Sequence, residues 1–186
     1  MLKKNLIIAL ALVLTTFVSF AQDKFYTKTG KITFYSKAPL EDNEGKNKTV
    51  TAVLDSKSGA IQFAVQMKGF EFEKQLMQQH FNENYVESDK YPKAEFKGTI
   101  TNNSDINYTK DGTYTAKVKG KLTIHGVTKD VETTGTIKVN GGSLDANSSF
   151  NVLLSDYNIK IPAIVKDKLS NSIKITVDCN LEPLKG

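Results

Sequence analysis

Hydrophobic and polar residues alternate with a period of two along most of this chain. From Tyr114 to Ile124 the even positions are apolar or small, whereas the odd positions carry threonine and lysine. His125 follows on the polar side, next to Gly126. In an extended strand, successive side chains point to opposite faces of the sheet. The segment therefore predicts a strand with one buried face, and His125 is expected at its polar end.

The same alternation recurs in about eight segments, which predicts an all-β fold. The clear segments cover residues 61–67, 96–100, 114–124, 127–139, 144–154 and 173–181, and less regular strands are expected near 31–35 and 49–54. Turn-forming residues separate several of them, as at 56–59, 110–112 and 140–142, and short turns join antiparallel strands. Eight such strands hide one face by closing into a barrel or by folding into a sandwich.

Two segments depart from the alternation. Residues 70–81 place Phe72, Leu76 and His80 four apart, which predicts a short amphipathic helix. Pro162 is expected to open a second short turn toward Leu169. Residues 40–48 are polar, and we expect a surface loop there. Glycines inside the strands, such as Gly98, Gly120 and Gly135, predict bulges or sharp bends.

The first 21 residues have the composition of a secretory signal. Lys3 and Lys4 precede an apolar run over residues 6–20, and small residues precede the cleavage site expected before Gln22. About 15 apolar residues are fewer than the roughly 20 that span a bilayer. We therefore expect residues 1–21 to be a signal peptide, residues 22–186 to form one domain without a transmembrane segment, and the protein to be exported to the periplasm or secreted.

The charge of the chain gives little support for nucleic-acid binding. The formal net charge is +5, and every basic residue is a lysine. Bidentate contacts to phosphate and guanine favour the arginine guanidinium, so we expect no nucleic-acid partner.

Candidate catalytic groups are few. The two histidines, His80 and His125, have no adjacent cysteine or carboxylate that would complete a metal site, so neither a metal nor a cofactor is expected. Cys179 lies among apolar alternating positions and is expected to be a small buried residue. Acids cluster at residues 83–89, where a solvated connection is the simpler interpretation. An enzyme that uses a histidine or these acids remains an alternative.

Several motifs give the chain a resemblance to the YceI-like family of exported lipocalin-like proteins. Residues 120–131 fit the pattern G-x-LTIxGVTK-x-V, and Tyr91-Pro92 followed by Phe96 fits YP-x-x-x-F. The resemblance implies an eight-stranded antiparallel lipocalin-like β-barrel with a short flanking helix and an apolar pore. It also implies a ligand with a long isoprenoid tail, such as a polyisoprenoid or an isoprenoid quinone.

Two segments differ from the family pattern, because they lack the arginines found there. They are residues 73–76, Glu-Lys-Gln-Leu, and residues 155–158, Ser-Asp-Tyr-Asn. The head group is therefore left open between a charged pyrophosphate and an uncharged group such as a quinone ring.

We therefore expect an exported, non-enzymatic carrier of a long apolar lipid. The residues expected to line its pore are Phe34, Phe63, Val65, Phe96, Tyr114, Val118, Leu122, Ile124, Phe150, Val152, Ile175 and Val177. The helix at the pore mouth is expected to present Phe72, Leu76 and His80. The alternatives are a secreted hydrolase of a small lipid ester or sugar, and a barrel with a filled core that binds a protein partner. The oligomeric state is open, with a homodimer as one option.

Overall fold

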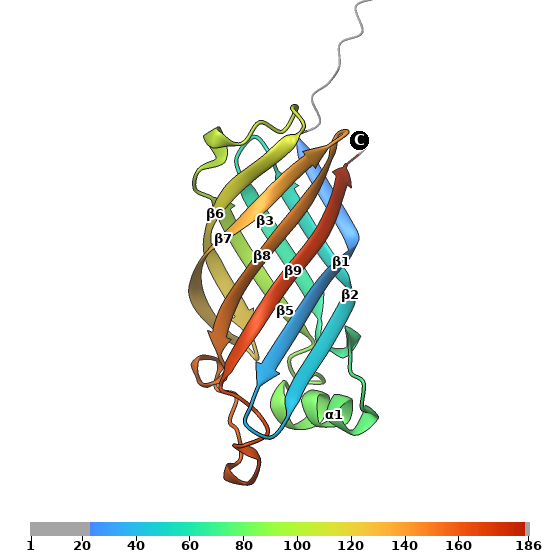
Figure 1. The fold of residues 1–186 in the computed structure, drawn as a ribbon, viewed down its shortest axis with the longest axis vertical. Helices are drawn as coiled ribbons and strands as arrows, with labels where there is room; N and C mark the ends of the chain where they lie inside the picture. Colours follow the sequence, from blue (N-terminus) through green and yellow to red (C-terminus); the bar gives the residue numbers. More distant parts are fainter. Residues whose placement is uncertain (1–22, 185–186) are drawn as a thin grey trace, which may run out of the picture.

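Eight long antiparallel strands form a closed barrel in the computed structural model, which describes residues 23–184 (Figure 1). The strands are β1 (Lys24–Lys37), β2 (Asp42–Asp55), β3 (Ala60–Gln66), β5 (Lys93–Ile100), β6 (Gly112–Ile124), β7 (Val127–Asn140), β8 (Ser143–Leu153) and β9 (Ser172–Pro183). Their order is β1-β9-β8-β7-β6-β5-β3-β2, and β1 pairs with β2 to close the ring. The predicted fold class is thus confirmed. The expected signal peptide, residues 1–21, lies outside the described residues.

Residues 40–48 do not form the surface loop that their polarity predicts, because β2 begins at Asp42. Along β2 the buried positions are Asn43, Gly45 and Asn47, and then the phase shifts so that Val50 is buried. The register between β1 and β2 shifts at the same place. A bulge here changes the inward positions from odd to even residue numbers, and the inward residues before it are polar or glycine. For these two reasons the alternation of β2 is not visible in the sequence.

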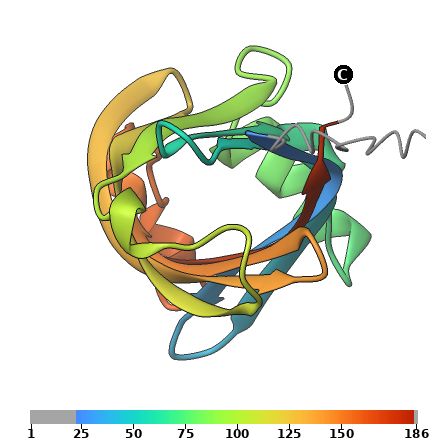
Figure 2. The same ribbon diagram turned by 90° about the horizontal axis from the view of Figure 1, so that it is seen from above.

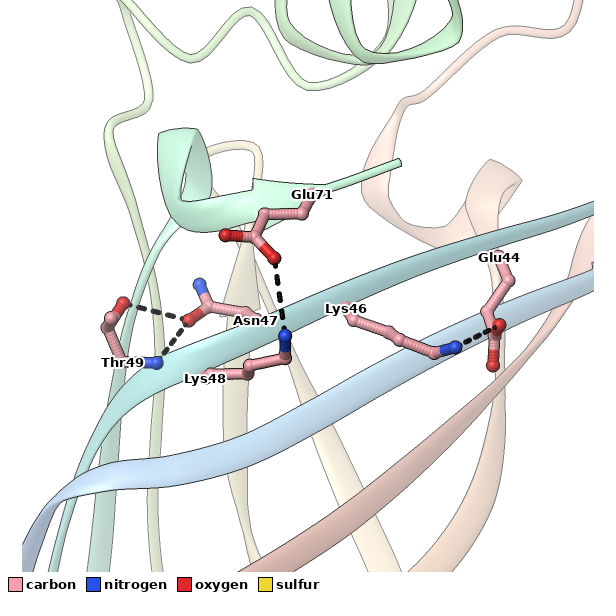
Figure 3. Close-up of polar contacts among 6 residues, drawn as sticks. All are labelled: Glu44, Lys46, Asn47, Lys48, Thr49 and Glu71. Atoms are coloured by element: carbon pink, nitrogen blue, oxygen red, sulfur yellow. Dashed lines mark hydrogen bonds and ion pairs between the residues drawn. The ribbon is translucent and has the colours of Figure 1, made fainter. Parts of the chain in front are cut away.

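The buried side-chain amide of Asn47 forms hydrogen bonds to the backbone where the register between β1 and β2 shifts (Figure 3). Its Nδ2 donates to the Gln66 carbonyl at 2.9 Å, and its Oδ1 accepts from the backbone nitrogen of Thr49 at 2.8 Å. The outward lysines of β2 form ion pairs instead, Lys46 with Glu44 and Lys48 with Glu71. A polar residue on the inner face of a strand is thereby satisfied without solvent.

The helical flank starts later and ends later than predicted. Phe70–Glu71 is a two-residue strand, β4, that pairs with β2. Helix α1 (Gln75–His80) follows and continues as a π-helical turn, η2 (Phe81–Tyr85). The remaining turns are 3-10 helices: η1 (Met67–Gly69), η3 (Asn103–Asp105), η4 (Leu154–Tyr157) and η5 (Ala163–Val165). The turn expected after Pro162 is therefore present as η5. Within residues 23–184, no helix has the length and apolar character needed to cross a membrane.

The two ends of the barrel differ. At the end where β1 starts and β9 finishes, Leu54, Leu144 and Leu181 are fully buried side by side in one apolar cluster. The connection from β5 to β6 covers this end with Ile106 and Tyr108, and Tyr108 stacks on Phe25 at 6.2 Å between ring centroids. Figure 1 shows α1 at the opposite end, beside the turn between β1 and β2. Seen from above, the strands form a closed ring (Figure 2).

Candidate functional site

A cavity of about 210 Å³ lies inside the barrel. Voids in a packed protein core rarely exceed the size of one water molecule, so this part of the interior is not a filled core. Apolar side chains from the long strands and from the helical flank make up most of its wall. They are Ile32, Phe34, Ile61, Phe63, Val65, Met67, Phe70, Phe72, Met77, Phe81, Val86, Phe96, Ile100, Val118, Leu122, Ile124, Val131, Ile137, Phe150, Val152, Leu154, Ile159, Leu169, Ile173, Ile175 and Val177.

All the residues predicted to line a pore lie in this wall except Tyr114. Those present are Phe34, Phe63, Val65, Phe96, Val118, Leu122, Ile124, Phe150, Val152, Ile175 and Val177. Tyr114 has the inward parity of β6 but lies toward the filled end, where it packs against the apolar cluster. Its hydroxyl donates to the Lys110 carbonyl at 3.0 Å, which anchors the loop before β6.

Of the three residues predicted on the helix at the pore mouth, one lies in the cavity wall and two do not. Phe72 lies in the cavity wall, but Leu76 is 64% exposed and His80 is absent from the wall. The reason is the phase of the helix. Because α1 starts at Gln75, Phe72 precedes the helix, and the inward positions are Met77, Phe81 and Tyr85, four apart. The spacing of these three was present in the sequence and would have indicated the same face.

Four phenylalanines gather where the helical flank meets the strands. The ring of Phe81 stacks on Phe34 at 5.3 Å and lies 5.0 Å from Phe72 and 5.4 Å from Phe70. Stacked and tilted rings at these distances attract each other beyond the area they bury. These apolar contacts hold the flank over this end of the cavity, together with the pairing of β4 with β2 and the ion pair between Lys74 and Glu41.

Inward glycines let two aromatic rings lie along the wall. A Cβ on Gly120 or Gly98 would lie 2.6 Å from an atom of the Phe96 ring, and a Cβ on Gly45 would lie 2.4 Å from the Phe34 ring. Gly98 and Gly120 are paired neighbours on β5 and β6. The sequence predicted bulges or bends at Gly98 and Gly120. In the structure their effect is to leave room for an aromatic ring beside the backbone.

The cavity wall is almost free of charge. Glu95 is the one acidic residue in it among the described residues, and it faces Lys97 on the outer surface at 4.0 Å. Burial raises the pKa of the Tyr85 phenol, so this group stays neutral at physiological pH. Such a wall offers dispersion contacts and apolar area to a ligand, and no counter-ion.

The candidate catalytic groups do not converge on the cavity. His125 is 11% exposed at its side chain, and its Nε2 lies 2.6 Å from Glu87 Oε2 while its Nδ1 lies 3.1 Å from the Tyr157 carbonyl oxygen. The Tyr91 ring meets the imidazole edge-on at 4.5 Å. Both Glu87 and His125 have positive φ. The histidine thus joins three connections at one end of the barrel, which is a structural role that the sequence pattern only partly indicated.

The other candidates have separate partners. Glu83 accepts from Gln79, and Asp89 pairs with Lys68. Cys179 is buried, as predicted, and burial raises the pKa of its thiol to about 11. The described residues contain no group of three or more histidine, cysteine, aspartate or glutamate side chains that could hold a metal.

The outer lysine face of β6 is balanced by acids on β7. Lys119 pairs with Glu132 at 2.6 Å, and Lys121 pairs with Asp130 at 2.9 Å. These exposed pairs reduce the net positive charge of the face that a protein partner would meet.

Comparison with known proteins agrees with this geometry. The model of the YceI-like domain family matches residues 15–181. No curated protein matches the chain.

Among solved structures, a polyisoprenoid-binding domain from Saccharophagus degradans, implicated in plant cell wall breakdown, superposes with a TM-score of 0.77 at 11% identity, covering 88% of this chain and 99% of that one. BcnA of Burkholderia cenocepacia gives a TM-score of 0.65 at 20% identity over 82% of this chain and 94% of that one. A YceI protein of Campylobacter jejuni gives a TM-score of 0.57 at 20% identity, covering 76% of this chain and 85% of that one. At these identities the structures support the fold alone.

Proposed function

Because the chain belongs to the YceI-like family, we propose that it is an exported, non-enzymatic carrier that holds a long apolar lipid inside the barrel. The observation that carries the proposal is the cavity with an almost wholly apolar wall. A neighbour of the same fold is described as a polyisoprenoid-binding domain, which supports an isoprenoid tail as the ligand.

Burial of a hydrocarbon chain is sufficient to explain tight binding. Large ligands gain roughly 0.3 kcal/mol per heavy atom, so about 30 buried atoms would give roughly 9 kcal/mol. That free energy corresponds to a dissociation constant below about 1 μM. No reactive group is required for this function, and His125, Glu83, Glu87 and Asp89 have structural partners instead.

Native mass spectrometry of the full chain, purified from the compartment in which it accumulates, tests the proposal. We expect an added mass of several hundred daltons, released by organic solvent, and an N-terminus at Gln22. Repeated preparations of the bare polypeptide that also fail to bind added geranylgeraniol, a 20-carbon isoprenoid alcohol, would contradict lipid carriage. An N-terminus at Met1 would contradict export and leave the carrier proposal standing.

A further inference from the structure

The hydrogen-bonded ladder between β7 and β8 covers only part of the two strands. Ladder pairs run from Asn140 and Ser143 to Gly135 and Ser148, and among the described residues they end there. Below that point β7 continues to Val127 paired with β6, and β8 continues to Leu153 paired with β9. Figure 1 shows the two strands side by side near their labels and β7 curving away from β8 below them. We call the region between residues 127–134 and 149–153 the open seam.

The cavity lining includes residues of the outer face at the point where the ladder between β7 and β8 ends, which we call the fork of the seam. Its wall includes Thr136 and Asn147, which alternate with the buried residues Ile137 and Ala146 and are exposed on the outer face. A groove on the outside of the barrel shares Gly135, Thr136, Asn147, Ser148 and Val177 with the cavity. The full set of residues along the groove is Thr115, Thr134, Gly135, Thr136, Asn147, Ser148, Ser149, Thr176 and Val177.

Gly135 permits the close approach of the strands at the fork. A Cβ at this position would lie 2.4 Å from the Asn147 carbonyl oxygen and 3.0 Å from the Ser148 Cβ. Any other residue would force β7 and β8 apart where their ladder ends. The seam therefore opens from a defined point, directly beside the inward side chains of Thr133 and Ser148.

The chemistry of the fork is polar and uncharged, unlike the rest of the wall. The hydroxyls of Thr133 and Ser148 lie 3.2 Å apart, and Ser148 Oγ donates to the Thr134 carbonyl at 3.3 Å. Hydroxyl groups can both donate and accept, so this pair can exchange one bond for a bond to a ligand. None of the residues along the groove is charged.

We propose that the open seam holds the uncharged polar end of the lipid, a hydroxyl or carbonyl group, while its chain extends into the cavity. The assignment deepens the proposed function and rests on it. A polar end placed deep in the apolar cavity would lose its hydrogen bonds, whereas at the fork it meets Thr133, Ser148 and water. A pyrophosphate would find no cation among the groove residues, so the fork selects for neutral head groups.

An affinity comparison with matched probes tests the chemistry. The probes are geranylgeraniol, its hydrocarbon counterpart without the hydroxyl, and geranylgeranyl pyrophosphate, each displacing a fluorescent apolar dye from the full chain. We expect the alcohol to bind about tenfold more tightly than the other two. The double substitution Thr133→Val and Ser148→Ala should reduce the alcohol to the level of the hydrocarbon and leave the hydrocarbon unchanged.

Thr113→Val supplies the control, because it removes a hydroxyl from the outer face of β6 outside both the groove and the cavity, and it should alter no affinity. Equal affinity for the three probes, or an equal loss for all of them in the double variant, would overturn the assignment. If none of the probes binds the unaltered chain, the proposed carrier function fails instead.

A second measurement locates the head group. Geranylgeraniol esterified with a nitroxide broadens the NMR signals of nearby backbone amides. We expect the strongest broadening at Gly135, Thr136 and Ser148. Broadening confined to residues 72–81 would place the head group beneath the helical flank and overturn the assignment, while still supporting lipid binding.

Discussion

The two ends of this barrel have the same alternating sequence pattern but opposite interiors. At the filled end the inward residues include leucines, and Leu54, Leu144 and Leu181 are fully buried against one another. Around the cavity the inward residues include larger side chains, such as Phe34 and Phe96, and yet space remains. The size of the inward side chains therefore does not decide whether a barrel is filled.

The positions next to each side chain account for the difference. Phe96 lies beside Gly98 and Gly120, and Phe34 lies beside Gly45, so each ring can occupy the space of a missing side chain. On the far side of the cavity, β7 and β8 diverge below Gly135 and Ser148. At the other end Leu144 and Leu181 are paired neighbours on β8 and β9, and the loop with Ile106 and Tyr108 packs over the cluster, which leaves them no free space.

Truncation of one leucine at each end gives the largest expected effect. Leu181→Ala removes a side chain with complete packing and should lower the free energy of unfolding by about 3–4 kcal/mol. Leu122→Ala faces the cavity and should cost about half as much, because part of its surface already lacks protein contacts. Urea denaturation of the two variants, without ligand, measures both values.

The affinity for lipid should depend less on Leu181 than on Leu122, although Leu181 contributes more to stability. Leu181→Ala should retain its affinity for geranylgeraniol, since Leu181 is not in the cavity wall. Equal losses of stability in the two variants would show that the hollow end is packed as tightly as the filled end, and would contradict the comparison.

A ring inserted into the cavity should have the next largest effect. Val118→Phe on the inner face of β6 would displace about four CH₂ groups of a bound chain, each worth about 0.8 kcal/mol. We expect the affinity for geranylgeraniol to fall on the order of 100-fold, with little change in stability because the ring enters existing space. Dye displacement and urea denaturation measure the two properties.

Lys117→Phe adds the same ring to the outer face of the same strand and serves as the control. Its affinity should stay within about twofold of the unaltered chain, because the ring lies outside the cavity. A similar loss of binding in both variants would indicate that strand β6 had been distorted, and would remove the support that Val118→Phe gives to the cavity.

The strands and most of the inward-facing residues could be predicted from the alternation, but the alternation did not show which part of the interior is filled or where a ladder between strands ends. Val131 and Val152 keep the inward phase on both sides of the open seam, because each strand is still paired with its other neighbour. Alternation is therefore the same whether or not a seam is closed. The phase shift near Asn47 also concealed the start of β2, and the position of Gly120 beside Phe96 depends on register, which a single strand does not encode.

Substitution of both histidines tests the rival enzyme hypothesis. His80→Gln with His125→Gln should leave lipid affinity unchanged, because neither side chain lies in the cavity wall. The free energy of unfolding should fall by roughly 1–2 kcal/mol, since the bonds from His125 to Glu87 and Tyr157 are lost in part. His80→Gln alone, at a partly exposed position, is the matched control and should be nearly neutral.

A loss of lipid affinity in the double variant at unchanged stability would contradict this account, because it would give the histidines a role in the ligand site. Turnover of a lipid ester by the unaltered chain that disappears in the double variant would favour the hydrolase instead.

The smallest expected effect concerns two neighbouring inward positions of β9. Cys179 belongs to the filled end, and burial raises the pKa of its thiol from the ordinary value of 9.0 to about 11. The unfolded chain therefore loses this proton at lower pH than the folded chain, so the stabilising contribution is lost as the pH rises from about 9 to about 11. We expect about 1 kcal/mol less stability at pH 10 than at pH 8 from this group, absent in Cys179→Ala.

The rate of thiol alkylation compares the accessibility of the filled end with that of the cavity. Native Cys179 should resist a small alkylating reagent at pH 8, because both its raised pKa and its complete burial suppress the reactive thiolate. Val177→Cys places a second thiol two residues away on the same face of β9, where it lines both the cavity and the outer groove and should be accessible to the reagent. Mass spectrometry should therefore detect one added label in this variant, and geranylgeraniol should slow its addition. Labelling of both cysteines at equal rates would mean that the filled end is as accessible as the cavity, which would contradict the comparison.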